Sequence, residues 1–150
     1  VISGWDTPAA YQHPIRLSLQ GIEVPVIGFI DLRYPDAVRE LKSSGKPRPG
    51  IVDDHAFQVA TYAMAIRQES GGWPQAFVDY LTPSGMKSYQ LMNGKRWVQE
   101  VVDTAAGIRA LLEQAEDKDA LCELITPDYN HWLWRYRPNS LAAAKELFGE

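Results

Sequence analysis

The stretch VPVIGFIDLRYPDAVRELKSSGK, residues 24–46, decides which fold we expect for this chain. Its first part is apolar and rich in β-branched side chains up to Asp31, which predicts a strand over residues 24–32. A turn containing Pro35, where a fixed φ suits the bend, leads into a shorter strand over residues 37–42. The stretch therefore predicts a hairpin with a carboxylate near the end of its first strand and charged side chains on its second.

The rest of the chain alternates between strand and helix patterns. Residues 1–13 have no regular pattern, and we expect them to be irregular. Asp53 is the expected N-cap of the first helix, and Asn139 or Ser140 that of the last. Further strands are expected over residues 15–19, 75–81 and 86–92, and helices over residues 53–69, 95–115, 119–125 and 141–148. This order predicts an α/β protein with a mixed sheet and helices packed against it.

Composition excludes several classes of protein. The 150 residues, with 45% hydrophobic and 23% charged side chains, suit a single globular domain over residues 1–150 and not a disordered chain. No apolar run is long enough for a membrane span, and no secretory leader is visible, so we expect a cytoplasmic protein without membrane partners. A single cysteine, Cys122, excludes an intramolecular disulfide and a four-cysteine metal site.

Charge is distributed unevenly along the chain. The formal net charge is −4, but residues 113–128 are strongly acidic and residues 33–48 are basic. Because salt screens distant charges, a local basic region can attract phosphate on a protein that is acidic overall. The loop over residues 42–48 is the segment that we expect to follow a phosphate backbone, and a solvated loop is its alternative.

Two acids and one amine are expected to converge on the hairpin. Glu40 and Lys42 are two residues apart on a strand, so their side chains point to the same face, and Asp31 lies on the neighbouring strand. Two carboxylates can hold a divalent cation through their oxygens, and an ammonium group beside them can help to position a water molecule. The simpler alternative is a salt bridge on a solvated face of the sheet.

The helix after the hairpin carries a row of polar side chains along one face. His55, Gln58 and Tyr62 are spaced by three and four residues and therefore share one face. A solvent-facing polar stripe explains this helix equally well when it is considered alone. Asp53 and Asp54 at its start are better explained by the helix dipole than by metal binding.

These motifs, taken in order, resemble a known family. The run GFID ending at Asp31, the run ELK beginning at Glu40 and the helix motif Gln58-x-x-x-Tyr62 resemble the PD-(D/E)XK nuclease superfamily, and within it the RecB-like exonuclease branch. The resemblance covers about residues 15–92. It implies a restriction-endonuclease-like α/β core, in which a mixed sheet of about five strands is flanked by helices.

The resemblance also implies roles for individual residues. Asp31 and Glu40 would bind Mg²⁺ or Mn²⁺ together with the backbone carbonyl of Leu41, and Lys42 would orient the attacking water and stabilise the transition state. The remaining residues expected to shape the site or contact the substrate are Gln58, Tyr62, Ser43, Lys46 and Arg48.

The resemblance implies a metal-dependent deoxyribonuclease, an exonuclease acting on DNA ends or single strands in repair, recombination or phage replication. Such a nuclease would act as a homo-oligomer or within a larger repair or recombination complex. A catalytically inactive nucleic-acid-binding or assembly module on the same fold is the alternative.

The chain departs from the family pattern in several places. Ile30 replaces the family's proline, and Asp36 lies in the turn, where it cannot oppose Glu40. Residues 1–14 show no sign of the family's N-terminal helix, so we expect a domain without it. With one cysteine, we expect no iron–sulfur cluster.

One further segment, residues 132–137, interleaves aromatic side chains with arginines. Such a sequence suits stacking on nucleic-acid bases, and it suits core packing equally well.

Overall fold

The structure is a computed structural model that describes residues 5–149. These residues form five strands, four α-helices and one 3₁₀ helix. In chain order the elements are β1 (Ala10–Leu17), β2 (Val26–Arg33), β3 (Ala37–Ser43), α1 (Asp53–Ser70), β4 (Gln75–Thr82), β5 (Gly85–Gln90), α2 (Gly94–Gln114), α3 (Lys118–Leu124), η1 (Trp132–Tyr136) and α4 (Pro138–Phe148). No described helix combines the length and apolar content needed to cross a membrane.

The chain divides into two compact units at Ala106 and Gly107. The first unit contains the sheet, α1 and the beginning of α2. The second contains the end of α2 with α3, η1 and α4. The candidate site lies entirely within the first unit.

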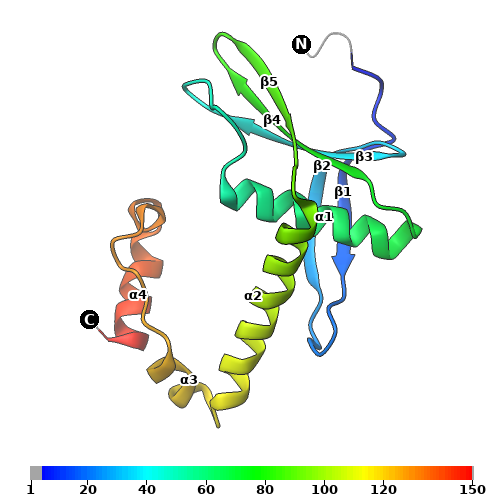
Figure 1. The fold of residues 1–150 in the computed structure, drawn as a ribbon. Helices are drawn as coiled ribbons and strands as arrows, with labels where there is room; N and C mark the ends of the chain where they lie inside the picture. Colours follow the sequence, from blue (N-terminus) through cyan, green and yellow to red (C-terminus); the bar gives the residue numbers. More distant parts are fainter. Residues whose placement is uncertain (1–4, 150) are drawn as a thin grey trace. The chain divides into compact units, whose positions relative to one another are not determined.

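A single mixed sheet forms the centre of the first unit (Figure 1). Its strands lie in the order β1-β2-β3-β4-β5. Antiparallel pairs join β1 to β2, β2 to β3 and β4 to β5, whereas β3 and β4 are parallel and connected through α1. A parallel pair requires such a crossover, because its strands cannot be joined by a tight turn. The expected mixed α/β sheet of five strands is confirmed.

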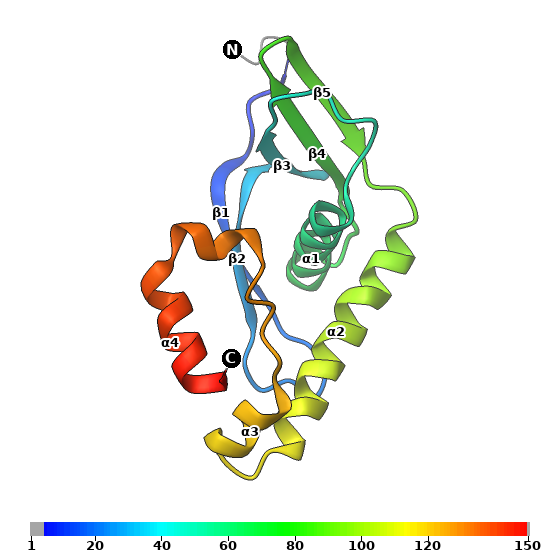
Figure 2. The ribbon, with the colours of Figure 1, turned by 90° about the vertical axis from the view of Figure 1, so that its left-hand side faces the viewer.

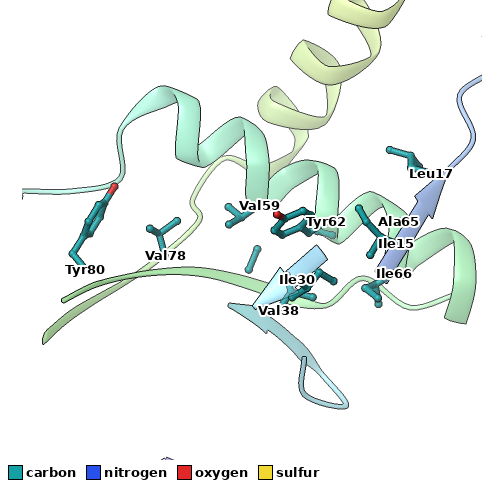
Figure 3. Packing of buried hydrophobic residues seen from close by; sticks show 12 residues of the cluster. Ile15, Leu17, Ile30, Val38, Val59, Tyr62, Ala65, Ile66, Val78 and Tyr80 are labelled. Atoms are coloured by element: carbon teal, nitrogen blue, oxygen red, sulfur yellow. The ribbon is translucent and has the colours of Figure 1, made fainter. Parts of the chain in front are cut away.

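Helix α1 covers one face of this sheet, and Figure 2 views it close to its own axis. Ile30, Val38 and Val78 point from three strands toward Val59 on the helix, and all four are fully buried (Figure 3). Burial of each such side chain contributes about 1.5–3 kcal/mol relative to exposure. This core fixes α1 over β3. Side chains that β3 directs toward α1 must therefore meet those that α1 directs toward the sheet.

The expected starts of β1 and α4 and the expected cap of α1 were wrong. Strand β1 begins at Ala10, within the segment expected to be irregular, because pairing with β2 extends it past Pro14 on the edge of the sheet. Asp53 is the first helical residue of α1, and Val52 occupies the cap position without a side-chain bond. Helix α4 begins earlier than expected, at Pro138, because proline suits the first turn of a helix.

Candidate active site

Strands β2 and β3 separate next to the expected acids. Their backbone pairing is confined to Leu32 with Arg39 and Arg33 with Val38. Beyond these pairs the carboxylate of Asp31 bridges the gap, and its Oδ2 accepts a 2.8 Å hydrogen bond from the Leu41 amide. Since a strand residue directs its N–H and C=O toward the same neighbour, the carbonyl of Leu41 also lies on the Asp31 side.

Asp31 is held from its other side by β1. Its Oδ1 accepts a 2.6 Å hydrogen bond from the Gln12 amide nitrogen. Gln12 has a φ of 46°, in a region that residues other than glycine seldom adopt. The sequence pattern did not suggest Gln12, because it lies in the segment that was expected to be irregular.

Glu40 is bound by two side chains, Lys42 and Gln58, and Gln58 is in turn bonded to Tyr62. The Lys42 ammonium lies 2.7 Å from Glu40 Oε1, and the Gln58 amide donates a 3.0 Å hydrogen bond to the same oxygen. The Gln58 amide also donates to the Tyr62 hydroxyl over 2.7 Å. Glu40 is only 5% exposed, and its second oxygen, Oε2, is buried without a partner among the residues that the structure describes.

The environment works against ionisation of two groups in this site. Burial raises the pKa of Glu40, the hydrogen bond from Lys42 lowers it, and the charge on Asp31 raises it further. Burial also raises the pKa of Tyr62, although the hydrogen bond from Gln58 opposes this shift and the charges on Glu40 and Asp31 add to it. Asp31, Glu40 and Tyr62 are therefore close enough to interact electrostatically.

This set of oxygens fits a hard divalent cation with few protein ligands. A buried carboxylate oxygen without a donor is costly unless a cation or proton satisfies it. No group of three or more His, Cys, Asp or Glu side chains suitable for a metal occurs within residues 5–149. Two carboxylates are nevertheless enough for Mg²⁺, which keeps several waters and often uses one or two carboxylates with substrate phosphates.

The other expected substrate-contacting residues, Ser43 at the end of β3 and Lys46 and Arg48 in the loop after it, behave differently from one another. Ser43 and Lys46 are exposed, and the structure shows no hydrogen bond or ion pair between their side chains and Asp31 or Glu40 within residues 5–149. The guanidinium of Arg48 lies 5.6 Å from the centre of the Tyr80 ring. The structure thus brings Arg48 toward the start of α1, and it leaves Ser43 and Lys46 at the surface.

A second buried charge pair, which the sequence pattern did not suggest, lies on the opposite face of the sheet. Arg39 Nη1 donates to both oxygens of Asp79, over 2.9 and 3.1 Å, and to the Ser88 hydroxyl. The Arg39 guanidinium also lies 4.5 Å from the centre of the Trp5 ring and 4.1 Å from that of Phe77. The sequence held one signal of this pair, because Asp79 is a charged residue within the otherwise apolar pattern of β4.

Comparison with known proteins supports the fold. No family model and no curated protein matches the sequence. A solved structure from Eubacterium rectale, of a protein named "Putative exonuclease", matches with a TM-score of 0.58 at 15% identity over 85% of this chain and 51% of its own. The structure of SSO0001 matches with a TM-score of 0.50 at 15% identity, over 79% of this chain and 59% of its own. The chain has the fold of these proteins and spans only about half of their length.

Proposed function

We propose that this protein is a metal-dependent nuclease that hydrolyses phosphodiester bonds in DNA, as an exonuclease of the RecB-like PD-(D/E)XK branch. The observation that carries the proposal is the buried Oε2 of Glu40, which has no partner among residues 5–149, beside the Asp31 carboxylate. A salt bridge on a solvated face would leave both carboxylate oxygens to water, and Glu40 is almost completely buried. The fold shared with a protein named as an exonuclease supports the same function.

Asp31, Glu40 and the backbone carbonyl of Leu41 are the groups that would hold Mg²⁺ or Mn²⁺. Such a cation supplies Lewis acidity, which neutralises charge on the phosphate and lowers the pKa of a nearby water. Gln12 and the Leu41 amide fix the two oxygens of Asp31, whereas Gln58 and Lys42 fix one oxygen of Glu40. The protein thereby presents both acids in a preformed arrangement.

Lys42 has two roles in this proposal. Its ammonium neutralises Glu40 in the structure, over 2.7 Å, and it is about one-quarter exposed. From this position it can donate to the attacking water and then stabilise the negative charge that develops on the phosphate. Gln58 and Tyr62 hold Glu40 in place and lie where a strand would approach the carboxylates.

The biological setting follows from the same resemblance. We propose DNA ends or single strands as substrates, in repair, recombination or phage replication within the cytoplasm. Because the chain spans about half of the matched structures, further parts of a larger protein, a homo-oligomer or a repair complex would complete the machinery.

A cleavage assay with matched variants tests this proposal. End-labelled DNA is incubated with the protein and Mg²⁺ or Mn²⁺, and metal uptake is measured by calorimetry. We expect loss of cleavage for Asp31→Asn and Lys42→Ala, and loss of metal uptake for Asp31→Asn. Asp36→Asn removes the same charge from the neighbouring turn and should leave both unchanged. Cleavage by Asp31→Asn at the wild-type rate would contradict the proposal. Binding of DNA without metal uptake or cleavage would identify an inactive binding module instead.

A further inference from the structure

A cluster of polar and aromatic side chains lies beside Lys42, and the proposed hydrolysis does not use it. Arg48 comes from the loop after β3, His55 from α1, Tyr80 from β4 and Tyr89 from β5. Figure 3 shows Tyr80 at the end of the buried core, with its hydroxyl directed toward the beginning of α1. We name these four residues the Tyr80 cluster.

The hydrogen bonds of Tyr80 determine which nitrogen of His55 carries a proton. The fully buried Tyr80 hydroxyl accepts a 3.3 Å hydrogen bond from the Val52 amide and lies 2.8 Å from His55 Nδ1. Among the described residues, His55 Nδ1 is the acceptor available for the hydroxyl proton, because Val52 contributes an N–H. The neutral imidazole then carries its own proton on Nε2. His55 therefore presents an N–H donor on the side away from Tyr80.

Arg48 is held in the Tyr80 cluster by its backbone. The Tyr89 hydroxyl donates to the Arg48 carbonyl, and the Tyr89 ring packs edge-on against Tyr80 with 6.1 Å between ring centres. No ion pair involves the Arg48 guanidinium within the described part of the chain. Burial and the charges of Lys42 and Arg48 lower the pKa of His55, and only Asp54 opposes them.

We propose that the Nε2–H of His55 and the guanidinium of Arg48 bind a phosphate of the nucleic-acid strand next to the phosphate that is hydrolysed at Asp31 and Glu40. A neutral N–H donor and a guanidinium without an acidic partner suit a phosphate oxygen, since contacts to phosphates position a strand without selecting its sequence. A terminal phosphate and an internal phosphodiester present the same oxygens. That the bound phosphate belongs to a nucleic-acid strand rests on the proposed function.

Binding of a short fluorescent oligothymidylate, measured by anisotropy in EDTA at several salt concentrations, tests this subsite. We expect His55→Leu, which has no side-chain donor, to weaken binding about ten-fold, as for loss of a hydrogen bond to a charged group, without changing the salt dependence. Arg48→Gln should weaken binding and reduce the slope of log K against log salt by about 0.7, the value for one phosphate contact on a single strand. Arg16→Gln, which removes an exposed arginine on β1, is the matched control. Its affinity should stay within about two-fold of wild type, because an arginine that makes no phosphate contact adds little to binding.

The outcomes separate this inference from the nuclease proposal. Wild-type affinity in both His55→Leu and Arg48→Gln, or an equal loss in Arg16→Gln, would overturn the subsite. An oligonucleotide with a terminal hydroxyl in place of its terminal phosphate identifies the source: weaker binding assigns the subsite to strand ends, and unchanged binding assigns it to internal phosphodiesters. Because EDTA prevents hydrolysis, a protein that fails the cleavage assay and still binds through His55 and Arg48 retains the subsite and loses the nuclease assignment.

Discussion

Strand β3 carries two neighbouring charges, Arg39 and Glu40, which are buried on opposite faces of the sheet in contrasting ways. On the face away from α1, both oxygens of Asp79 are hydrogen-bonded to Arg39. On the face toward α1, Glu40 keeps one oxygen without any partner among the described residues. A buried charge pair with all of its bonds made can be structural, whereas a buried carboxylate that lacks a bond requires another explanation.

The contrast assigns different consequences to the two faces. Breaking the Arg39–Asp79 pair leaves a largely buried charge without compensation, so its cost should appear as lost stability. Changing Glu40 removes an acid that the fold already disfavours, because burial raises its pKa. Its cost should appear as lost chemistry. Each prediction below tests one side of this division, from the largest expected effect to the smallest.

Glu40→Gln should have the largest effect, and it should act on activity. The amide keeps the shape of the side chain and removes the negative charge that would help to hold a divalent cation. We expect metal-dependent cleavage to fall about a thousand-fold, at the upper end of the effect of losing one transition-state stabilising group. The initial rate on end-labelled DNA measures it. A variant that melts like wild type and cleaves DNA within a few-fold of the wild-type rate would contradict a functional role for Glu40.

Asp79→Ala should have the largest effect on stability. The substitution leaves the Arg39 guanidinium, about one-fifth exposed, without its carboxylate. We expect a loss of about 3 kcal/mol in the free energy of unfolding, measured by urea denaturation. The double variant Arg39→Met and Asp79→Leu should recover most of it, because apolar side chains of similar size replace a buried ion pair well. A single variant as stable as wild type would show that this pair does not support the fold.

The same contrast explains what could be predicted from the sequence. Local patterns identified the strands and helices, because alternation and helical spacing follow from which side of an element is buried. Spacing also predicted that Glu40 and Lys42 share a face of β3 and that Gln58 and Tyr62 share a face of α1, whereas only the family resemblance implied that the two pairs meet. Their roles in hydrolysis remain a prediction.

Contacts that depend on the register between distant elements could not be predicted. Gln12 reaches Asp31 only because β1 pairs with β2 on both sides of Gln12, and Asp79 meets Arg39 only through the parallel register of β3 and β4. His55 and Tyr80 lie 25 residues apart and meet only once α1 packs over β4. Neither residue type nor spacing within one element contains this information.

Tyr62→Phe tests how firmly Glu40 must be held, and its effect should be modest. The hydroxyl accepts a hydrogen bond from Gln58, which in turn donates to Glu40. Loss of one such bond costs about 1 kcal/mol, so we expect a decrease of about five-fold in cleavage rate and a similarly small loss of stability. Steady-state kinetics and thermal melting on the same samples measure both. A loss as large as that of Glu40→Gln would place the hydroxyl itself in the reaction.

The smallest expected effect is a pH dependence from His55, a titratable group on the α1 side of the sheet. Its pKa is lowered from the ordinary value of 6.5 by burial and by the charges of Lys42 and Arg48. The unfolded chain therefore binds a proton more readily as the pH falls below 6.5, and stability decreases from there toward the pKa of the folded protein. His55→Gln should lose less stability than wild type between neutral and mildly acidic pH. The difference should be a fraction of the roughly 1.4 kcal/mol per pH unit that one proton can contribute, because His55 is only partly buried. Urea denaturation at a series of pH values measures it, and parallel curves for the two proteins would show that the neighbouring cations do not influence His55.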